Sequence, residues 1–592
     1  MPTLLFLLAV LGAPLSDTTR IARVSGLVSA QPHVAGDRAN PKVLAALLGE
    51  LQAAGLDTMR TPFRAYLPQP RGPQLQRTQP YPGLLPNIEL RVGEDSLTFS
   101  GIWPIFSPYS PDGDIEAPVV YVNEGRAADY RTLDSVRVSP SGTWLIARRS
   151  SCAPWAVARA AKAHGARGLL LYSDPARDGY MQGETYPDGR MRHPDAAERM
   201  LARAGVGDPG LEGAANAVPL PVIPIGYKVA NQLMSLLLRP SLPNAWQGAL
   251  PFRYHAGYGE VRLRAITDSE KGDTGWKDLA NGFATIRGRR LPNEVIVIGA
   301  HYDALGPGAV DNGSGVAVAV EVAARLAAAQ RAGWAPERTI IVALWDGSEW
   351  GAIGSSAWLR SQADSTLDRI VAYVDLKRVA AGDSLQVTGA PLLADAAFRA
   401  LRAAPLVSRT VLATRDAAVV RPRPGPSDAA VMHEGFGIPA IRIAYDGQDA
   451  TARTGYDTPM YLRRFVDPGW QRHDAVASMV TALVRDLAAA GPAAYAPQRL
   501  VAAIQADARP TADVSALLPR LAGSAARTTG FERRLLAAEG REPFGWSRHL
   551  LFGTDAECGE RIVALPFGGA DAVRALTRLP VAAPARTRGK SG

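Results

Sequence analysis

The chain has 592 residues, of which 47% are hydrophobic and 20% are charged. This composition is typical of a folded globular protein and excludes a disordered chain and a multi-span membrane protein. At roughly 100–200 residues per domain, the length indicates about three domains. The net charge of +9 is spread along the chain, so no basic run predicts a nucleic-acid partner. Two cysteines, Cys152 and Cys558, are too few for a disulfide framework or a cysteine zinc cluster.

An apolar run of about a dozen residues, Leu4–Leu15, lies near the start of the chain. It is too short to span a bilayer but has the length of a signal-peptide core. No Lys or Arg precedes it, which leaves open a frayed or mis-started N-terminus. We therefore expect a signal peptide at 1–19, an extracytoplasmic or secreted protein, and no membrane span.

The N-terminal half predicts helices first and a strand-rich block later. Residues 20–60 look helical, since Val43–Leu56 has helical spacing and closes on Gly55. Residues 61–113 are rich in Pro, Gly and Gln and predict a long connection. A block of short apolar strands and one Ala-rich helix then follows, with an edge strand at its end. The segments are Pro118–Asn123, Thr143–Arg148, Ala156–His164 (the helix), Gly168–Pro175 and Val218–Tyr227 (the edge strand).

The second half alternates apolar strands with helices, which predicts an α/β sheet covered on both faces. A long Ala/Val-rich helix is expected at Gly313–Ala332, and helices dominate from about Asp474, with a break at Pro492–Pro497. The predicted strands are Phe283–Gly288, Glu294–Ala300, Arg338–Trp345, Arg369–Asp375 and Pro439–Tyr445.

Polar residues cluster at the carboxyl ends of these central strands, where open α/β sheets place their sites. His301 follows one strand, Asp311 and Asn312 open the long helix, and Glu349 follows the next strand. Imidazole and carboxylate groups suit zinc, and Asp303 could hold the His301 ring from behind. A solvated loop with capping residues is the alternative for the same pattern.

A series of collinear motifs makes the chain resemble the glutamate carboxypeptidase II and transferrin-receptor-like group of the zinc aminopeptidase family. The resemblance implies a zinc-exopeptidase-like α/β domain with a mixed sheet between helices (20–75 and 276–490). It also implies an inserted β-rich protease-associated domain (76–275) and a helical dimerisation domain (491–592). The motifs include Phe106–Gly113, Leu170–Ala176, Thr185–Gly189, Val222–Tyr227, Gly299–Ala304, Val310–Gly315, Leu344–Ser355, Pro426–Ala440 and Phe465–Pro468.

The resemblance also implies a two-zinc site, in which a glutamate polarises the metal-bound water as general base. Three ligand positions match, at His301, Asp311 and Glu349. The base position holds Ser348, and the other two ligand positions hold Lys377 and Arg453. In the family, a cis peptide bond joins the residues that correspond to Asp311 and Asn312.

These departures predict that the site binds no zinc pair and that no cofactor is present. Lys377 and Arg453 would pair with the remaining acids and restore neutrality. A one-residue slip in the register is the alternative, with Asp375 as the ligand in place of Lys377. Nearby histidines that might substitute are His433 and His473. Pocket residues carried over from the family are Arg199, Ser427, Asp428 and Arg442.

Three functions fit this pattern. The first is a non-catalytic peptidase homologue that forms a homodimer and binds a peptide or protein ligand. The second is an active zinc exopeptidase, an aminopeptidase or carboxypeptidase, that uses one metal or an altered base. The third is a hydrolase with new chemistry at Ser348, for which Lys377 is the one conceivable partner.

Overall fold

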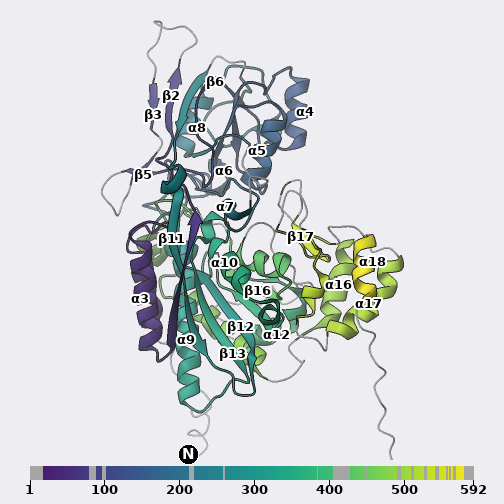
Figure 1. The fold of residues 1–592 in the computed structure, drawn as a ribbon. Coiled ribbons are helices and arrows are strands. Elements are labelled where there is room, and N and C mark those ends of the chain that lie inside the picture. The colour runs from purple at the N-terminus through teal and green to yellow at the C-terminus, as the bar shows by residue number, and fades with distance from the viewer. Residues whose placement is uncertain are drawn as a thin grey trace, which may run out of the picture.

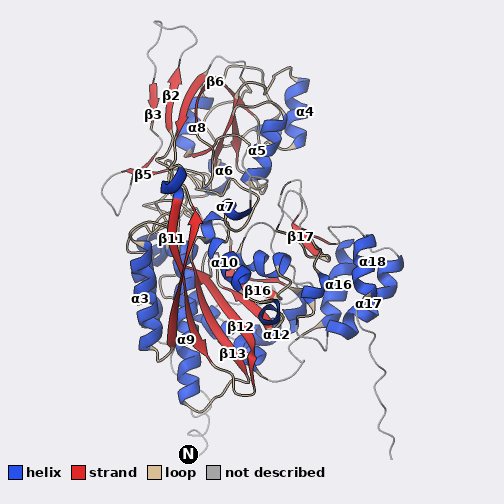
Figure 2. Cartoon of the chain, in the orientation of Figure 1, coloured by secondary structure: helices blue, strands red, loops and turns tan. Residues whose placement is uncertain are grey.

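Two seven-stranded sheets and a group of C-terminal helices build the molecule (Figures 1 and 2). The computed structural model describes residues 18–78, 88–91, 93–95, 102–212, 219–257, 261–382, 384–403, 427–447, 450–489, 495–508, 512–525, 530–539, 546–554, 558, 562–564 and 569–578. The expected signal-peptide core, Leu4–Leu15, lies outside these residues. Among the described helices, none combines the length and the apolar character that a membrane crossing requires.

The first sheet has a parallel centre and antiparallel edges. β13, β12, β14 and β16 run parallel, so their carboxyl ends meet at one edge of the sheet. β1, β11 and β15 add antiparallel pairs on the two sides. In order across the sheet the strands are β1 (Asp57–Tyr66), β11 (Trp276–Ile286), β13 (Arg338–Trp345), β12 (Leu291–His301), β14 (Ile370–Asp375), β16 (Ala440–Asp446) and β15 (Ser384–Gly389).

Helices cover both faces of this sheet, as the continuous apolar strands predict. One face packs on five helices in the largest core. The other face places Trp345 and Tyr373 against shorter helices and Trp546. The first group is α2 (Thr18–Val28), α3 (Asn40–Ala53), α9 (Ser314–Arg331), α12 (Ala394–Ala403) and α15 (Gln471–Ala488); the second includes α10 (Ile353–Ser361) and α13 (Asp428–Ala430).

A second sheet is formed by the chain between β1 and β11, and it has its own core. β9 lies at its edge, where the prolines of that segment predict it. Across the sheet the strands are β3 (Ile88–Leu90), β2 (Gln74–Thr78), β10 (Arg262–Thr267), β6 (Gly113–Tyr121), β7 (Trp144–Arg148), β8 (Gly168–Tyr172) and β9 (Val222–Ile225). Its helices include α4 (Ala127–Ser135), α5 (Pro154–Ala163), α6 (Pro175–Asp178), α7 (Pro209–Glu212) and α8 (Tyr227–Met234).

The C-terminal helices pack around a small separate core that includes Leu500, Leu521 and Phe552. Figure 1 shows them beside the first sheet, in green and yellow. They are α16 (Pro497–Ala508), α17 (Ala512–Ala525) and α18 (Gly569–Thr577), accompanied by β17 (Phe552–Thr554) and β18 (Ile562–Ala564).

Short helical turns complete the fold. They are α11 (Asp364–Leu367), α14 (Pro459–Tyr461), η2 (Asn244–Trp246), η3 (Gly272–Gly275), η6 (Pro391–Leu393) and η9 (Leu462–Val466).

Two expectations from the sequence are wrong in detail. Residues 57–60 are not helical but begin β1, which pairs with β11. Residues 61–113 are not a bare connection, because they hold the rest of β1 and the strands β2, β3, β4 (Gly93–Asp95) and β5 (Ile102–Pro104). The two cysteines form one disulfide, Cys152–Cys558, where the sequence excluded only a framework of several.

Candidate functional site

The parallel strands deliver the predicted polar residues to one edge of the first sheet. His301 is the last residue of β12, and Asp311 lies in the short turn η4 (Ala309–Gly313) before α9. Ser348 and Glu349 follow β13 in the 3-10 turn η5 (Ser348–Trp350). Gly347 precedes this turn with a φ of 68°, a conformation that glycine adopts freely and that turns the chain back over the sheet.

The loop that carries Asp311 is held in place by a second carboxylate, that of Asp457. The peptide bond between Asp311 and Asn312 is cis, as the resemblance implies. The amides of Val310 and Asp311 donate to the Asp457 carboxylate at 2.7 and 2.9 Å. Gly315 lets α9 begin close to the residue that follows β14, since a Cβ at Gly315 would lie 2.1 Å from the Leu376 carbonyl oxygen.

Three buried residues form a group that could hold a metal ion. His301 Nε2 lies 3.7 Å from Asp311 Oδ1 and 3.5 Å from Glu349 Oε1. One potential ligand atom from each residue lies within 4.8 Å of the others. His301 Nε2 and both carboxylate oxygens of Asp311 have no hydrogen-bond partner among the described residues.

Two basic side chains enter the same space. Lys377 Nζ lies 2.8 Å from Glu349 Oε1 and 3.7 Å from Asp311 Oδ1. Arg453 Nε lies 2.7 Å from Glu349 Oε2, and one of its terminal nitrogens lies 3.6 Å from Asp311 Oδ2. Glu349 is thus bound tightly by both cations, whereas Asp311 meets them at longer range.

The charges of this group shift one another's pKa values. Burial raises the pKa of the Glu349 carboxyl, but Arg453 and Lys377 outweigh it and lower that pKa to about 2. Burial also raises the pKa of the Asp311 carboxyl, but the charges of Lys377 and Arg453 outweigh this effect. The pKa of Asp311 therefore lies well below its usual range. Burial lowers the pKa of Lys377, yet Asp311 and Glu349 raise it overall. All three groups are therefore held in their charged forms.

His301 is held by its neighbours in a protonated form. Burial and Lys377 lower the pKa of the ring, but Asp303 and Asp311 raise it overall to about 10. Nδ1 lies 3.0 Å from the backbone oxygen of Asp303 and 3.4 Å from its carboxylate. The Asp303 carboxylate mainly accepts from the amides of Ser348 and Glu349, at 2.9 and 3.1 Å. Asp303 therefore shapes the turn η5 as well as contacting the histidine.

Ser348, at the predicted base position, has an acid as its partner. Its hydroxyl donates to Asp428 Oδ2 at 2.6 Å, and Ser355 donates to the other oxygen of that carboxylate at 2.5 Å. A hydroxyl that donates to a carboxylate has a candidate proton acceptor, but Lys377 binds Glu349 and Asp311 instead of Ser348. The serine–lysine pairing considered from the sequence is not made in the described residues.

The expected pocket residues are mostly engaged in structural contacts. Arg199 is fully buried and pairs with Glu94, which is also fully buried, at 2.8 Å. Ser427 caps α13 by accepting from the amide of Ala430. Arg442 donates to the Lys377 carbonyl oxygen at 2.6 Å, which steadies the segment after β14. These contacts place Arg199 in the interior, paired with Glu94, and Arg442 against the backbone of Lys377.

The alternative ligands considered from the sequence lie elsewhere. Asp375 accepts from the Tyr373 hydroxyl at 3.3 Å within β14, while Lys377 reaches the acids. His473 Nδ1 lies 2.7 Å from Asp467 at the start of α15. His433 faces Glu532, with 3.4 Å between His433 Nε2 and Glu532 Oε2. The register with Lys377 at the site is the one that the structure has.

Glu198 joins the site from the inserted chain, and no sequence pattern predicts it. Glu198 accepts from Arg453 at 2.9 Å and contacts Arg149 closely, and Arg192 lies 3.9 Å away. Glu198 belongs to an irregular segment without periodicity, so its proximity to Arg453 depends on the tertiary fold alone. It extends the charge network from the first sheet to the loops of the second.

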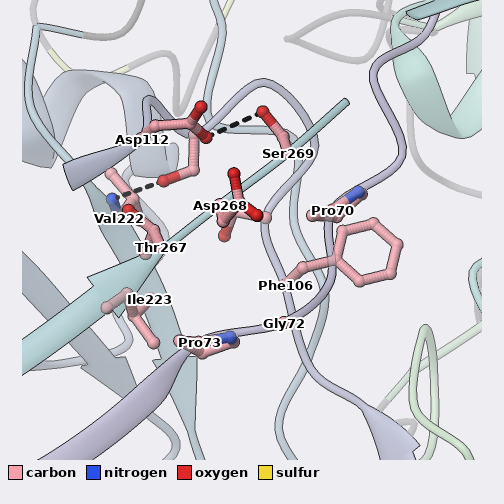
Figure 3. Close-up of a pocket in the computed structure, with 12 residues that line it drawn as sticks. Pro70, Gly72, Pro73, Phe106, Asp112, Val222, Ile223, Thr267, Asp268 and Ser269 are labelled. Atoms are coloured by element: carbon pink, nitrogen blue, oxygen red, sulfur yellow. Dashed lines mark hydrogen bonds between the residues drawn. The ribbon is translucent and has the colours of Figure 1, made fainter. Parts of the chain in front are cut away.

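One pocket lies apart from this network, at the base of the second sheet (Figure 3). It is a small, partly open hollow with a cavity volume of about 20 Å³, and it is lined by residues such as Phe106, Asp112 and Ser269. Asp112 accepts from the Ser269 hydroxyl at 2.7 Å, one of the dashed lines in the figure. The site residues at the edge of the first sheet do not line this pocket.

Comparison with known proteins agrees with this geometry. Residues 281–473 match the model of peptidase family M28, which spans β12, α9, β13, β14 and β16. Aminopeptidase NAALADL1 of Rattus norvegicus is 28% identical over 533 residues, covering 78% of this chain and 69% of the relative. A probable glutamate carboxypeptidase, LAMP1 of Arabidopsis thaliana, is 28% identical with coverages of 78% and 71%.

Two further comparisons bear on the fold. Human transferrin receptor protein 2 is 29% identical over 370 residues, covering 58% of this chain and 45% of the receptor. The structure of a zinc aminopeptidase from Bacillus subtilis aligns with a TM-score of 0.52 at 16% identity, covering 80% of this chain and 95% of that one. This likeness shows the fold, and with the family match it confirms the expected α/β class. Residues 281–473 are therefore a peptidase family M28 domain, in a chain related to aminopeptidases, glutamate carboxypeptidases and transferrin receptors.

Proposed function

We propose that this protein is a non-catalytic homologue of the M28 peptidases, with a degraded two-zinc site. The contacts of Lys377 and Arg453 with Glu349, at 2.8 and 2.7 Å, are the observation that carries the proposal. They supply the positive charge that metal ions supply in a dizinc peptidase, and they fill the space beside the acids.

Electrostatics opposes a zinc pair in this site. Two unit charges of the same sign about 4 Å apart repel by about 4 kcal/mol at an effective dielectric near 20, and a dication doubles this. An ion bound to Asp311 and Glu349 would lie at about this distance from both cations. The residues present therefore do not fit a zinc pair.

Catalysis also lacks its usual base. Ser348 stands where the family has a glutamate, and a hydroxyl does not accept a proton from water at neutral pH. Its own contact, a donated hydrogen bond to Asp428, holds the side chain against the protein. The proposed role is therefore binding or structural, with a peptide or protein as ligand.

We extend the proposal to assembly and location. The inserted region 76–275 acts as a protease-associated domain, and the C-terminal region 491–592 contributes to a homodimer. The disulfide Cys152–Cys558 supports an extracytoplasmic or secreted location, because such bonds persist in oxidising compartments. Analytical ultracentrifugation tests the dimer, and a purely monomeric chain at micromolar concentration would refute it.

Restoring the ligands tests the site directly. Lys377→Asp with Arg453→His rebuilds the two missing ligand positions, and the double variant should bind zinc at His301, Asp311 and Glu349, where the wild type does not. Lys377→Met with Arg453→Leu is the matched control, because it removes both cations without adding ligands. Adding Ser348→Glu to the first variant then tests whether peptide hydrolysis returns.

The wild type decides the proposal. Elemental analysis of purified wild-type protein should find no zinc that depends on Glu349, and a panel of aminopeptidase and carboxypeptidase substrates should remain uncleaved. A zinc pair that Glu349→Gln removes, or cleavage that a chelator abolishes, would overturn the proposal.

One observation favours the second candidate, an active exopeptidase with one metal. His301 Nε2 and both oxygens of Asp311 lack hydrogen bonds in the described structure, as an unloaded ligand set would. Peptide hydrolysis that requires one bound metal ion and that persists in Lys377→Met would establish this candidate in place of the first.

A further inference from the structure

A buried histidine shapes the turn through which the C-terminal segment contacts the M28 domain. His549 is fully buried and precedes β17. The amides of Leu551 and Phe552 donate to its Nδ1 at 3.2 and 3.3 Å. An imidazole nitrogen that accepts hydrogen bonds carries no proton, so the ring is neutral and its single proton is on Nε2. The fold therefore requires the neutral form of His549.

The turn that this ring organises lies against the M28 domain, and we call residues 546–554 the docking turn. Trp546 packs in the core that covers one face of the first sheet, and its indole donates to the Ala204 carbonyl oxygen at 3.1 Å. The amide of Arg548 donates to the carbonyl oxygen of Glu434 at 2.8 Å. The shape of the docking turn therefore decides whether the C-terminal segment keeps these contacts.

A buried acid of the M28 domain depends on the same turn. Glu434 lies in the π-type turn η8 (Val431–Gly435) and is fully buried. Its carboxylate accepts from the Ser547 hydroxyl at 2.7 Å and from the amide and hydroxyl of Thr554 at 3.0 and 3.2 Å. These donors lie on either side of His549 in the docking turn. The two amide bonds to the His549 ring thus help to keep both donors within reach of Glu434.

The charged groups that pack against His549 do not accommodate a second proton on its ring. The ring of His433, from η8, stacks on it with centroids 4.6 Å apart. Glu532, which opens the 3-10 turn η11 (Glu532–Leu535), lies 3.4 Å from Nε2 of His433. A ring nitrogen or carboxylate oxygen of each residue lies within 4.8 Å of the others. One carboxylate compensates only one of two stacked rings, so protons on both would leave a buried charge without a partner.

The other groups near the ring do not offset this cost. β17 contributes the uncharged ring of Phe552, whose centroid lies 6.2 Å from that of His549. Tyr495, which interacts with Glu532, donates its hydroxyl to the Val371 carbonyl oxygen at 2.7 Å. Burial, followed by the charge of the stacked histidine, holds the pKa of His549 well below 6.5.

We propose that His549 is a pH-sensitive switch, in which uptake of one proton by its ring in mildly acidic solution releases the docking turn from the M28 domain. An imidazolium has a donor at each nitrogen and no acceptor, so both amides lose their partner whichever way the ring turns. The docking turn then opens, and Glu434 loses the donors that the turn supplies. This regulation goes beyond the proposed binding role and uses none of the residues of the candidate site.

The direction of the pH dependence follows from the two states of the turn. In the docked state His549 stays neutral, whereas in the open state its ring is in water and has the ordinary pKa of about 6.5. The open state therefore binds one more proton in acid. The equilibrium constant for opening rises about tenfold for each pH unit below about 6, until the docked ring titrates as well. The docked state is favoured at neutral pH.

Hydrogen exchange of the full chain measures this opening. In wild type, the opening constant of residues 547–554, corrected for the intrinsic effect of pH on exchange, should rise about tenfold between about pH 6 and pH 5. His549→Asn should abolish this rise, because the asparagine oxygen can accept from the same two amides and does not titrate. His164→Asn, at an exposed histidine, is the matched control and should keep the wild-type response.

The outcomes decide the proposal even if His549→Asn fails to fold. Opening that does not change in wild type between about pH 7 and pH 5 would overturn it. A rise that Glu434→Gln or His433→Gln abolishes and His549→Asn retains would assign the titration to another group and would also overturn it. None of these results depends on whether the candidate site binds zinc, so the proposed function is tested separately.

Discussion

Lys377 and Arg453 together balance the charge of the candidate site, because each of them contacts both Glu349 and Asp311. Replacing Lys377 by Met removes one cation from both acids. Among the ion pairs of the described residues, Asp311 then keeps Arg453 at 3.6 Å and His301 at 3.7 Å. Breaking a buried charge pair on one side costs about 3–5 kcal/mol. We expect Lys377→Met to lower the free energy of unfolding by about this amount, measured by urea denaturation.

Two further variants check that prediction. Lys271→Met, at a lysine that is 72% exposed, should change the unfolding free energy by less than about 0.5 kcal/mol. Adding Glu349→Gln to Lys377→Met removes one of the uncompensated charges and should recover part of the loss. A Lys377→Met protein as stable as wild type would show that the lysine does not compensate the acids.

Asp346 gives the clearest dependence of stability on pH. Burial, followed by the charge of Asp303, raises the pKa of its carboxyl from 3.8 to about 7. Between these values the folded chain keeps the proton while the unfolded chain has lost it. Stability therefore falls as pH rises from about 4 to 7 and is constant above, a loss of up to about 4 kcal/mol.

Asp346→Asn removes this titration with little change in shape. The carboxylate accepts from the Asn40 amide at 2.7 Å, and the Asn40 oxygen is itself without a partner, so that amide can turn to accept from the new one. Urea unfolding at several pH values should show no gain near pH 4 and a gain over wild type that grows to its maximum near pH 7. A difference that does not vary with pH would contradict the shifted pKa.

The residues of the site differ in how far the sequence could predict them. His301, Asp311 and Glu349 follow apolar runs, and those runs predict strands whose ends meet at one edge of the sheet. The resemblance to a family was needed for Lys377 and Arg453, because neither stands in a local pattern of its own. Glu198 could not be predicted, since an irregular segment brings it to Arg453.

Elements with a buried face were predictable, and the exposed edge was not. β14 is a buried, largely apolar run, and so is the second half of β12, from Ile296 onward. β1 contains two arginines and a proline, and most of its side chains are exposed or half-buried. It is a strand because its backbone pairs with β11 along ten residue positions. The pattern of apolar and polar side chains does not predict this backbone pairing.

The disulfide links two elements that the sequence could not bring together. Cys152 lies before α5 in the inserted chain, and Cys558 lies beyond β17, at a sequence separation of 406. The Cys558 carbonyl oxygen also accepts from the amide of Ala153 at 2.9 Å. Closing so long a loop restricts the unfolded chain, which in the chain-entropy model stabilises the fold by about 6 kcal/mol at most.

Reduction should therefore loosen the link between these elements. We expect dithiothreitol to lower the melting temperature of wild type, and Cys152→Ser with Cys558→Ser to melt at the reduced value with or without it. After limited cleavage of the chain by a protease, the fragments that carry Cys152 and Cys558 should migrate together in gel electrophoresis without reductant. Separation of the parts without reductant would show that the bond does not form.

At the scale of the whole molecule, the two sheets meet through buried charge as well as through the chain. Glu198 binds Arg453 from the candidate site and Arg149, which follows β7 in the second sheet. Only 8% of Glu198 is exposed, so the arginines around it depend on its charge. The network gives the candidate site a direct connection to the inserted region.

Glu198→Gln tests this connection. The amide keeps the shape but not the charge, and it leaves Arg149 and Arg453 with less compensation, which should cost about 3–5 kcal/mol of stability. Hydrogen exchange should rise together in residues 192–208 and in residues 450–458, because Glu198 holds both segments. Glu184→Gln, at an exposed glutamate of the same inserted segment, should change neither. Faster exchange in one segment alone would mean that the sheets are held by apolar packing and that the charge network only lines their junction.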